Sequence, residues 1–136
     1  MSYPITDIEG IDGEAAAILK TVKIRSTGRL LEAARTVKCR HDLSIKTGFN
    51  EKQILCWANV ADRMRIKGIN REYSQLLGAA GVDTVKELKF RNPRNLAQAM
   101  ADANKKRKVV RLLPSEKVVA RWIEHAKKLQ LMISYR

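Results

Sequence analysis

The chain repeats one pattern of residues at a spacing of 58 positions, and this repeat limits the folds open to it more than any other feature. Eight positions match at this spacing, which indicates an internal duplication, in which two copies of one structural unit fold in the same way. We therefore expect two related halves, residues 1–65 and residues 66–136. The matched positions are Ile8, Gly10, Ile11, Glu14, Leu19, Ile24, Ser26 and Leu30 in the first half, and Ile66, Gly68, Ile69, Glu72, Leu77, Val82, Thr84 and Leu88 in the second.

A second match has an offset of 65 and covers one apolar stripe in each half. Both stripes step by 3, 4 and 3 residues, which places their members on one face of a helix. Asn50 and Ser115 precede the two helices as N-caps. Because the offset grows, the second half carries about seven extra residues between Leu88 and Ser115. The stripes are Ile54, Trp57, Ala61 and Met64, and Val119, Trp122, Ala126 and Leu129.

The stretch from residue 66 to residue 88 predicts a turn, a helix, a second turn and a further helix. Gly68 can adopt backbone angles that other residues resist. Asn70 has two possible uses there, left-handed backbone angles or capping of the next helix through its side-chain oxygen. Gly81 ends that helix, and Thr84 with Glu87 forms a capping box that starts the next one.

Helical spacing and capping residues recur along the rest of the chain and predict an all-α fold, with the two halves packed as one compact helical domain. Trp57 is expected in the core, and a solvent-exposed stacking Trp is the alternative. The apolar tail, residues 131–136, packs back on the domain or contacts a partner or a second copy. Further helices are expected at about 13–22, 27–35, 38–47, 51–65, from 93 onward and at 115–129.

The turn and the helix after it resemble a helix-hairpin-helix motif, through Ile66, Gly68, Ile69, Ser74 and Leu77. Short pieces resemble the helix-hairpin-helix domains of X-family DNA polymerases and archaeal recombinases. The chain from about residue 4 to 129 resembles an uncharacterised bacterial family known as a domain of unknown function, whose members resemble tandem helix-hairpin-helix proteins. The phrases YPITDIEGI and GVDTVKEL and the paired Trp helices carry this likeness. Asp12 and Asn70 depart from the motif, which usually has Gly there.

The resemblance implies that backbone N–H groups of the hairpin hold a nucleic-acid phosphate, since unpaired N–H groups and a helix N-terminus favour an anion. The net charge of +13 supports a polyanionic partner. Residues 1–65 hold 11 basic and 8 acidic residues, whereas residues 66–136 hold 16 and 6. The first hairpin is surrounded by carboxylates, which repel phosphate, so we expect it to be structural. Those carboxylates are Asp7, Glu9, Asp12 and Glu14.

The second hairpin is the strongest candidate site, with Arg63 and Arg65 delivered to it by the preceding helix. The alternative is that the turn only joins two helices. The basic run at 105–108, with Arg111, is either a second phosphate contact or a solvated loop. The predicted nucleic-acid-binding residues are Arg65, Lys67, Gly68, Ile69, Asn70, Arg71, Lys105, Lys106, Arg107 and Lys108.

These patterns predict a non-enzymatic module that binds nucleic acid through the phosphate backbone and without reading sequence. The resemblance to helix-hairpin-helix proteins, which usually act on DNA, implies DNA in preference to RNA. No grouping of convergent catalytic side chains points to an enzyme. The alternative is a protein-interaction or scaffold module of the same fold that binds an acidic protein partner. The oligomeric state stays open.

The remaining features exclude other classes of protein. No cofactor is expected, and Cys39 and Cys56 are too few for a zinc site and are expected as reduced thiols. The sequence has no apolar run of about 18 residues, the length that a transmembrane helix needs, and no membrane partner is expected. The N-terminus lacks the apolar segment of a signal peptide, so we expect a cytoplasmic protein.

Overall fold

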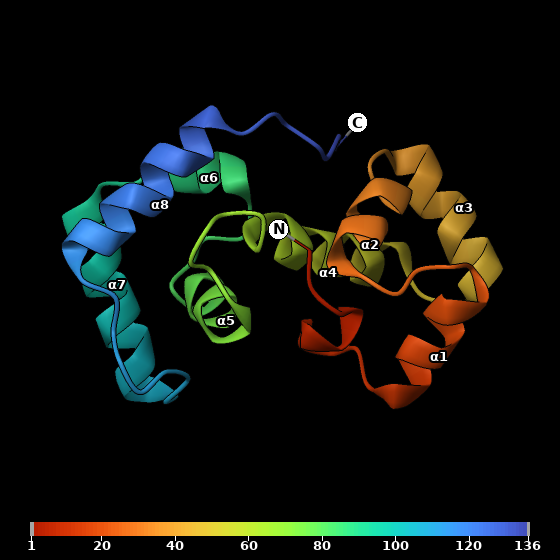
Figure 1. Cartoon of the computed structure of the whole chain (residues 1–136), viewed down its shortest axis with the longest axis horizontal. Coiled ribbons are helices and arrows are strands. Elements are labelled where there is room, and N and C mark those ends of the chain that lie inside the picture. Colours follow the sequence, from red (N-terminus) through yellow and green to blue (C-terminus); the bar gives the residue numbers. More distant parts are fainter. Residues whose placement is uncertain (1, 136) are drawn as a thin grey trace.

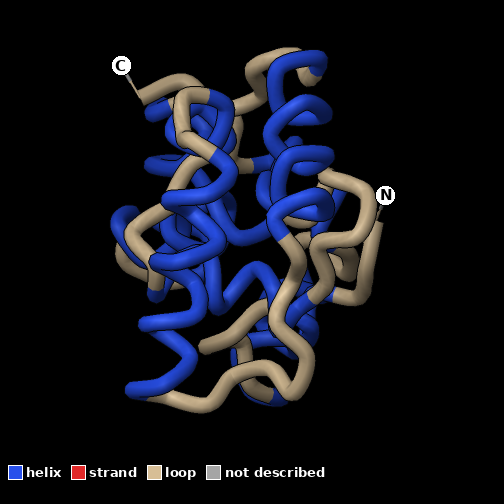
Figure 2. The backbone as a smooth tube through the Cα atoms, turned by 90° about the vertical axis from the view of Figure 1, so that its left-hand side faces the viewer, coloured by secondary structure: helices blue, strands red, loops and turns tan. Residues whose placement is uncertain are grey.

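The structure, a computed structural model, describes residues 2–135 and is all-α over that range (Figure 1). Helices are joined by short loops, with no β-strand among the described residues (Figure 2). The described elements are a 3-10 helix η1 (Ile5–Asp7) and the α-helices α1 (Gly13–Thr21), α2 (Thr27–Ala33), α3 (Val37–Thr47), α4 (Glu51–Arg63), α5 (Arg71–Ala79), α6 (Val85–Lys89), α7 (Pro93–Lys106) and α8 (Glu116–Lys128).

Each described α-helix begins after a polar residue whose side chain accepts a hydrogen bond from a backbone N–H of the first turn. This bond satisfies one of the N–H groups that a helix start leaves open, which explains why the helix starts there. The caps predicted from the sequence are confirmed, and Asn70 is a cap rather than a left-handed residue. The eight caps are Asp12, Ser26, Thr36, Asn50, Asn70, Thr84, Asn92 and Ser115.

Two helices end two residues earlier than predicted, and the other predicted bounds agree to within one residue. α4 ends at Arg63 instead of Arg65, because the chain tightens there into successive three-residue turns, in which Arg65 N–H donates to Asp62 O and Ile66 N–H donates to Arg63 O. α2 ends at Ala33, two residues before Arg35. Thr36 is already the N-cap of α3, so the residues between Ala33 and Thr36 form the loop that joins the two helices.

Buried apolar side chains form two clusters, each containing one Trp. The first cluster takes its members from residues 5–61 together with Ile133, and the second takes them from residues 66–126. Trp57 and Trp122 are both buried, so the prediction of a core Trp57 is confirmed. α4 packs against α2 and α3 in the first cluster, and α8 packs against α6 and α7 in the second.

The C-terminal tail crosses from α8 back to the first cluster, as Figure 1 shows. Ile133 is buried there, and Ser134 N–H donates to Arg35 O at 2.7 Å. The Tyr135 hydroxyl donates to Asn59 Oδ1 at 2.7 Å. The expected packing of the tail against the domain is therefore confirmed, and the tail ties the last helix to the first part of the chain.

The two turns that match in sequence also match in structure. Gly10 and Gly68 have φ of +95° and +94°, a region that L side chains avoid. An ideal Cβ on Gly10 would lie 3.3 Å from Trp57 Nε1, and one on Gly68 would lie 3.1 Å from Trp122 Nε1. Each turn therefore presses its glycine against the indole nitrogen of the Trp in its own cluster.

Candidate nucleic-acid interface

The turn between α4 and α5, residues 66–70 and here named hairpin two, is anchored by buried Ile66 and Ile69. Ile69 N–H donates to Ile66 O at 3.1 Å, which closes the turn. Asn70 accepts from Tyr73 N–H at 3.0 Å and so begins α5. Ile69, a predicted site residue, thus shapes the turn and offers a ligand neither its side chain, which is fully buried, nor its N–H group, which is already bonded.

Four backbone N–H groups of this region have no hydrogen-bond partner within the described chain: those of Gly68, Asn70, Arg71 and Glu72, the last of which also brings a carboxylate to the first turn of α5. These N–H groups lie at the start of α5, where the helix dipole is positive. Gly68, Asn70 and Arg71 are exposed, as is Lys67. The geometry that binds an anion at a helix start is therefore present and open to solvent.

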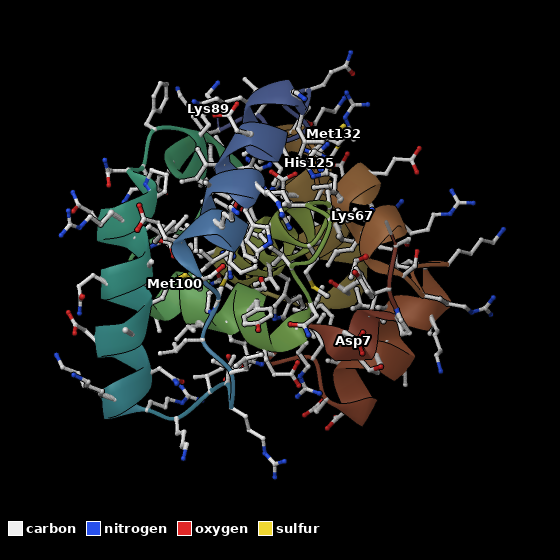
Figure 3. All side chains as sticks on the ribbon, turned by 60° about the vertical axis from the view of Figure 1, so that its left-hand side comes forward. Asp7, Lys67, Lys89, Met100, His125 and Met132 are labelled. Atoms are coloured by element: carbon white, nitrogen blue, oxygen red, sulfur yellow. The ribbon has the colours of Figure 1, made fainter. Side chains whose placement is uncertain are left out.

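A hollow of about 540 Å³ borders hairpin two, and α8 forms its other wall. Its apolar surface comes from Val118 and Trp122, and its polar groups come from Lys67, Arg121 and His125. Figure 3 shows Lys67 and His125 close to each other. Lys67 N–H donates to His125 Nδ1 at 3.1 Å.

The bond to Lys67 N–H has a consequence for the imidazole of His125. A ring nitrogen that accepts a hydrogen bond carries no proton, so the neutral ring holds its proton on Nε2. Nε2 is then a donor on the other side of the ring. His125 both fixes Lys67, the second residue of hairpin two, and offers a donor at the hollow.

Arg65 was predicted to contact phosphate, and the structure places its side chain in an internal ion pair. Nη2 of Arg65 lies 2.6 Å from Asp62 Oδ1, and Nε donates to the same oxygen at 2.7 Å. Nη2 also donates to Gln130 O at 3.0 Å, which ties α4 to the segment after α8. Burial raises the pKa of Asp62 from its ordinary value of 3.8, and the charge of Arg65 offsets part of that rise. Arg65 is therefore engaged in holding the fold.

The sequence also placed Arg63 at the hairpin, and this expectation is wrong because the side chain is buried. Its guanidinium donates to Asp83 O at 2.7 Å, and to Ser74 Oγ and O at 3.2 and 3.1 Å. Burial lowers the pKa of Arg63. Arg63 thereby fixes α5, and with it hairpin two, against the end of α4.

The basic run at 105–108 is exposed, and none of its four side chains lines the hollow at hairpin two. Lys105 and Lys106 end α7, while Arg107 and Lys108 begin the following loop. Nη2 of Arg107 donates to Glu9 Oε1 of the first hairpin at 3.0 Å, between side chains that are 74% and 49% exposed. A pair this exposed contributes little to stability.

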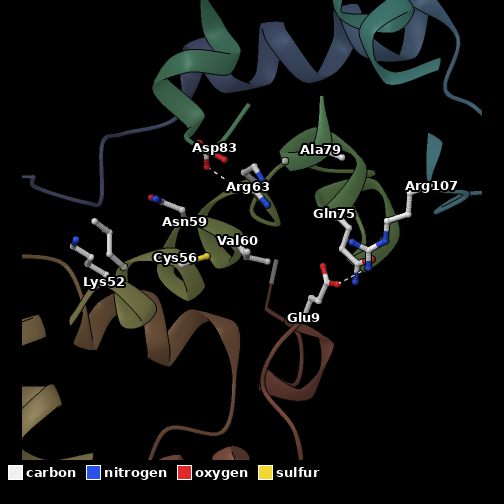
Figure 4. A pocket seen from close by; sticks show the side chains of 12 residues that line it. Glu9, Lys52, Cys56, Asn59, Val60, Arg63, Gln75, Ala79, Asp83 and Arg107 are labelled. Carbon is white, nitrogen blue, oxygen red and sulfur yellow. Dashed lines mark hydrogen bonds and ion pairs between the residues drawn. The ribbon is translucent and has the colours of Figure 1, made fainter. Parts of the chain in front are cut away.

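A second cavity of about 480 Å³ lies where Arg107 meets the first half (Figure 4). Three of its charged side chains already have partners, because Arg107 bonds to Glu9 and Arg63 bonds to Asp83 O. Cys56 lines this cavity as an exposed free thiol.

The first turn, residues 8–12 and here named hairpin one, has a matching but smaller hollow of about 220 Å³. Carboxylates of Asp12 and Glu14 line it, where hairpin two has cations. The ring of Phe49 packs edge-on against Trp57 with centroids 4.9 Å apart and occupies part of this space. The two hollows thus present opposite charge.

Arg121 and His125 are site residues that the sequence did not assign to the hairpin. Arg121 stood out only as one of several cations on the outer face of the last helix. Both residues flank Trp122, at one position before it and three after it, and Trp122 faces Gly68. That spacing around the repeated Trp is the signal that could have found them.

Residues 2–135 contain no group of three or more His, Cys, Asp and Glu side chains placed to hold a metal ion. Within the same range, no helix has the length and apolar character needed to cross a membrane.

One protein family, described as Domain of unknown function (DUF4332), matches residues 9–129. Comparisons with curated proteins and with solved structures gave no match. The matched range includes most of hairpin one, all of hairpin two and both Trp helices. The chain therefore belongs to the DUF4332 family, a domain of unknown function.

Proposed function

We propose that this chain is a non-enzymatic nucleic-acid-binding module that holds the phosphate backbone of DNA at hairpin two, without reading sequence. The observation that carries the proposal is the set of open N–H groups of Gly68, Asn70 and Arg71, together with the hollow that Gly68 lines and that cations border. Backbone donors at a helix start and nearby basic side chains form the usual chemistry of a phosphate site.

In the proposed complex, oxygens of one phosphate accept from the open N–H groups at the start of α5. Lys67 and Arg71 are exposed and form no salt bridge with a described residue, so they are available to neutralise neighbouring phosphates. Arg121 and the Nε2–H of His125 reach the ligand from α8. Arg65 is left out, because its guanidinium is already paired with Asp62.

We further propose that the two halves are tandem helix-hairpin-helix units. Support comes from the glycines of positive φ, each facing a Trp indole nitrogen, and from the capping residues Asp12 and Asn70 that follow them. The capping role also accounts for the absence of the usual glycine at these two positions. DNA is preferred over RNA because the families that this motif resembles act on DNA.

The proposal assigns different roles to the two hairpins. Glu9, Asp12 and Glu14 surround hairpin one with negative charge, and a carboxylate near a phosphate opposes binding. Hairpin one is therefore a structural turn, whereas hairpin two is the binding site.

Fluorescence anisotropy with a labelled duplex, from about 50 to 200 mM salt, tests this function. If about four phosphates are neutralised, the affinity falls roughly 100-fold over that range. The variant Lys67→Glu/Arg71→Glu should bind at least about tenfold more weakly and with a shallower salt dependence. The matched control is Lys38→Glu/Lys46→Glu, which makes the same charge change at exposed positions of α3.

A charge-reversed variant of residues 105–108 locates the site further. Loss of binding in this variant alone would move the phosphate contact to the loop after α7. Equal losses in the hairpin variant and in the α3 control would show that only net charge matters. Absent binding, or binding that salt does not weaken, would refute the proposal.

A scaffold that binds an acidic protein partner is the second candidate. It is favoured by hairpin one, which has the same turn and a surface unsuited to nucleic acid. A pull-down from nuclease-treated extracts separates the two functions. Proteins retained without nucleic acid, and released by Lys67→Glu/Arg71→Glu, would favour the scaffold.

A further inference from the structure

An aromatic side chain points into solvent at the turn between α6 and α7. Phe90 is 75% exposed, although both Trp residues are buried. A single exposed apolar residue is common on protein surfaces and by itself indicates nothing. What distinguishes Phe90 is the basic character of the residues around it.

Four basic residues lie within four positions of Phe90, and none of them forms a salt bridge with a described residue. Lys89 Nζ lies 5.3 Å from the centroid of the Phe90 ring, which holds a positive charge beside the aromatic surface. The nearest carboxylate in sequence, Glu87, accepts a hydrogen bond from the Thr84 hydroxyl. The four basic residues are Lys86, Lys89, Arg91 and Arg94.

The first half lacks this feature at the equivalent place. α2 and α6 begin after the matched caps Ser26 and Thr84, and the matched Leu30 and Leu88 are both fully buried. The same offset aligns Phe90 with Glu32, whose carboxylate lies 3.8 Å from Arg29. Among residues 2–135, the exposed aromatic turn therefore occurs only in the half that carries hairpin two.

The turn is connected to the proposed binding site through α8. α6 packs along α8, and α8 carries His125, which bonds to hairpin two through Lys67 N–H. In the view of Figure 3, His125 lies between Lys89 and Lys67. One extended polyanion that occupies the hollow at hairpin two could thus continue across α8 to Phe90.

We propose that Phe90 stacks on an unpaired base, while the basic residues around it hold the adjoining phosphates. Every base has an aromatic face, so such stacking is tolerant of sequence. Bases inside a duplex are already stacked on each other, and an aromatic side chain reaches them only by separating them. The preferred ligand is therefore a duplex that continues into a single strand. This inference rests on the proposed function, to which it adds a second contact.

Three labelled probes test the stacking contact: a blunt duplex, the same duplex with a short single-stranded thymidine overhang, and one whose overhang has phosphates and sugars without bases. Wild-type protein should bind the thymidine overhang about tenfold more tightly than the blunt duplex. The abasic overhang should recover little of this gain, because it supplies phosphates but no ring to stack on.

The variants change exposed side chains, so each is expected to fold as the wild-type protein does. Phe90→Ala should abolish the preference for the overhang and leave the affinity for the blunt duplex within about twofold. Phe90→Trp should keep the preference, since it retains an aromatic face. Ile45→Ala is the matched control, because Ile45 is 70% exposed and lies on α3, outside the basic turn.

Several outcomes would overturn the inference. These are an unchanged preference in Phe90→Ala, equal binding of abasic and thymidine overhangs, Phe90-dependent binding to vesicles of anionic phospholipid, and Phe90-dependent dimers in sedimentation. If the wild-type protein bound none of the three probes, that result would instead refute the proposed function. Binding of the thymidine overhang alone, dependent on Phe90, would support the stacking contact and refute the phosphate site at hairpin two.

Discussion

Replacing Gly68 with alanine would test the contact that holds hairpin two against α8. The substitution has two separable costs, because Gly68 has φ of +94° and because its new Cβ would lie 3.1 Å from Trp122 Nε1. Gly81 supplies the matched control. It has φ of +93°, but no atom within 4 Å of an added Cβ.

The backbone cost of alanine at such angles is about 1–2 kcal/mol, so Gly81→Ala should lower the free energy of unfolding by about this amount. Trp122 is 2% exposed, and its ring packs against Tyr73 with centroids 5.3 Å apart, so it has little room to move. Overpacking of this kind adds about 1–3 kcal/mol. The expected total for Gly68→Ala is therefore about 2–5 kcal/mol.

Equilibrium urea denaturation, followed by circular dichroism and Trp fluorescence, measures these differences. For a chain of this size, 1 kcal/mol corresponds to a shift of about 4 °C in Tm, so thermal melts provide a second reading. Gly13→Ala should be neutral or slightly stabilising, because Gly13 has no positive φ and no atom near an added Cβ. The reasoning would be refuted if Gly68→Ala cost no more than Gly81→Ala.

Two further predictions concern the end of α4. Arg63→Lys should lower the free energy of unfolding by about 2–4 kcal/mol in urea melts. The reason is that an ammonium group cannot reach both Asp83 O and Ser74 O in place of the guanidinium. A loss below about 1 kcal/mol would contradict this role. Asp62→Asn should cost more stability near pH 3 than at pH 7. Burial raises the pKa of folded Asp62 above 3.8, so the stability that this group contributes is present below that pH and declines as the pH rises through the folded pKa. A larger cost at pH 7, measured by urea melts at both pH values, would show that the ion pair with Arg65 outweighs burial.

Local structure followed from short-range chemistry that can be recognised in the sequence. Ser, Thr, Asn and Asp side chains reach N–H groups only two or three residues ahead, so the caps at Asn70 and Thr84 could be predicted without knowing the fold. The glycines that end or bend the chain, such as Gly48 and Gly68, are equally local. The apolar stripe containing Trp57 predicted its burial, because helical spacing places that stripe on one face.

The direction of long polar side chains was not determined in this way. Arg63 and Arg65 both adjoin hairpin two in sequence, yet one is buried against α5 and the other is paired with Asp62 and Gln130 O. Long side chains can reach several partners, and burial selects among them by the cost of leaving a charge or a carbonyl without one. That cost depends on what surrounds the side chain after the helices have packed.

The sequence by itself determined the helical class, the helix starts and the sharp turns, since these depend on residues within a few positions of each other. Only the tertiary structure decided which cations border hairpin two. His125 contacts Lys67 across 58 positions, and Arg121 reaches the same hollow because Trp122 packs α8 against Gly68. Contacts at this separation depend on how two helices pack as rigid bodies, and residue spacing within either helix carries no information about that packing.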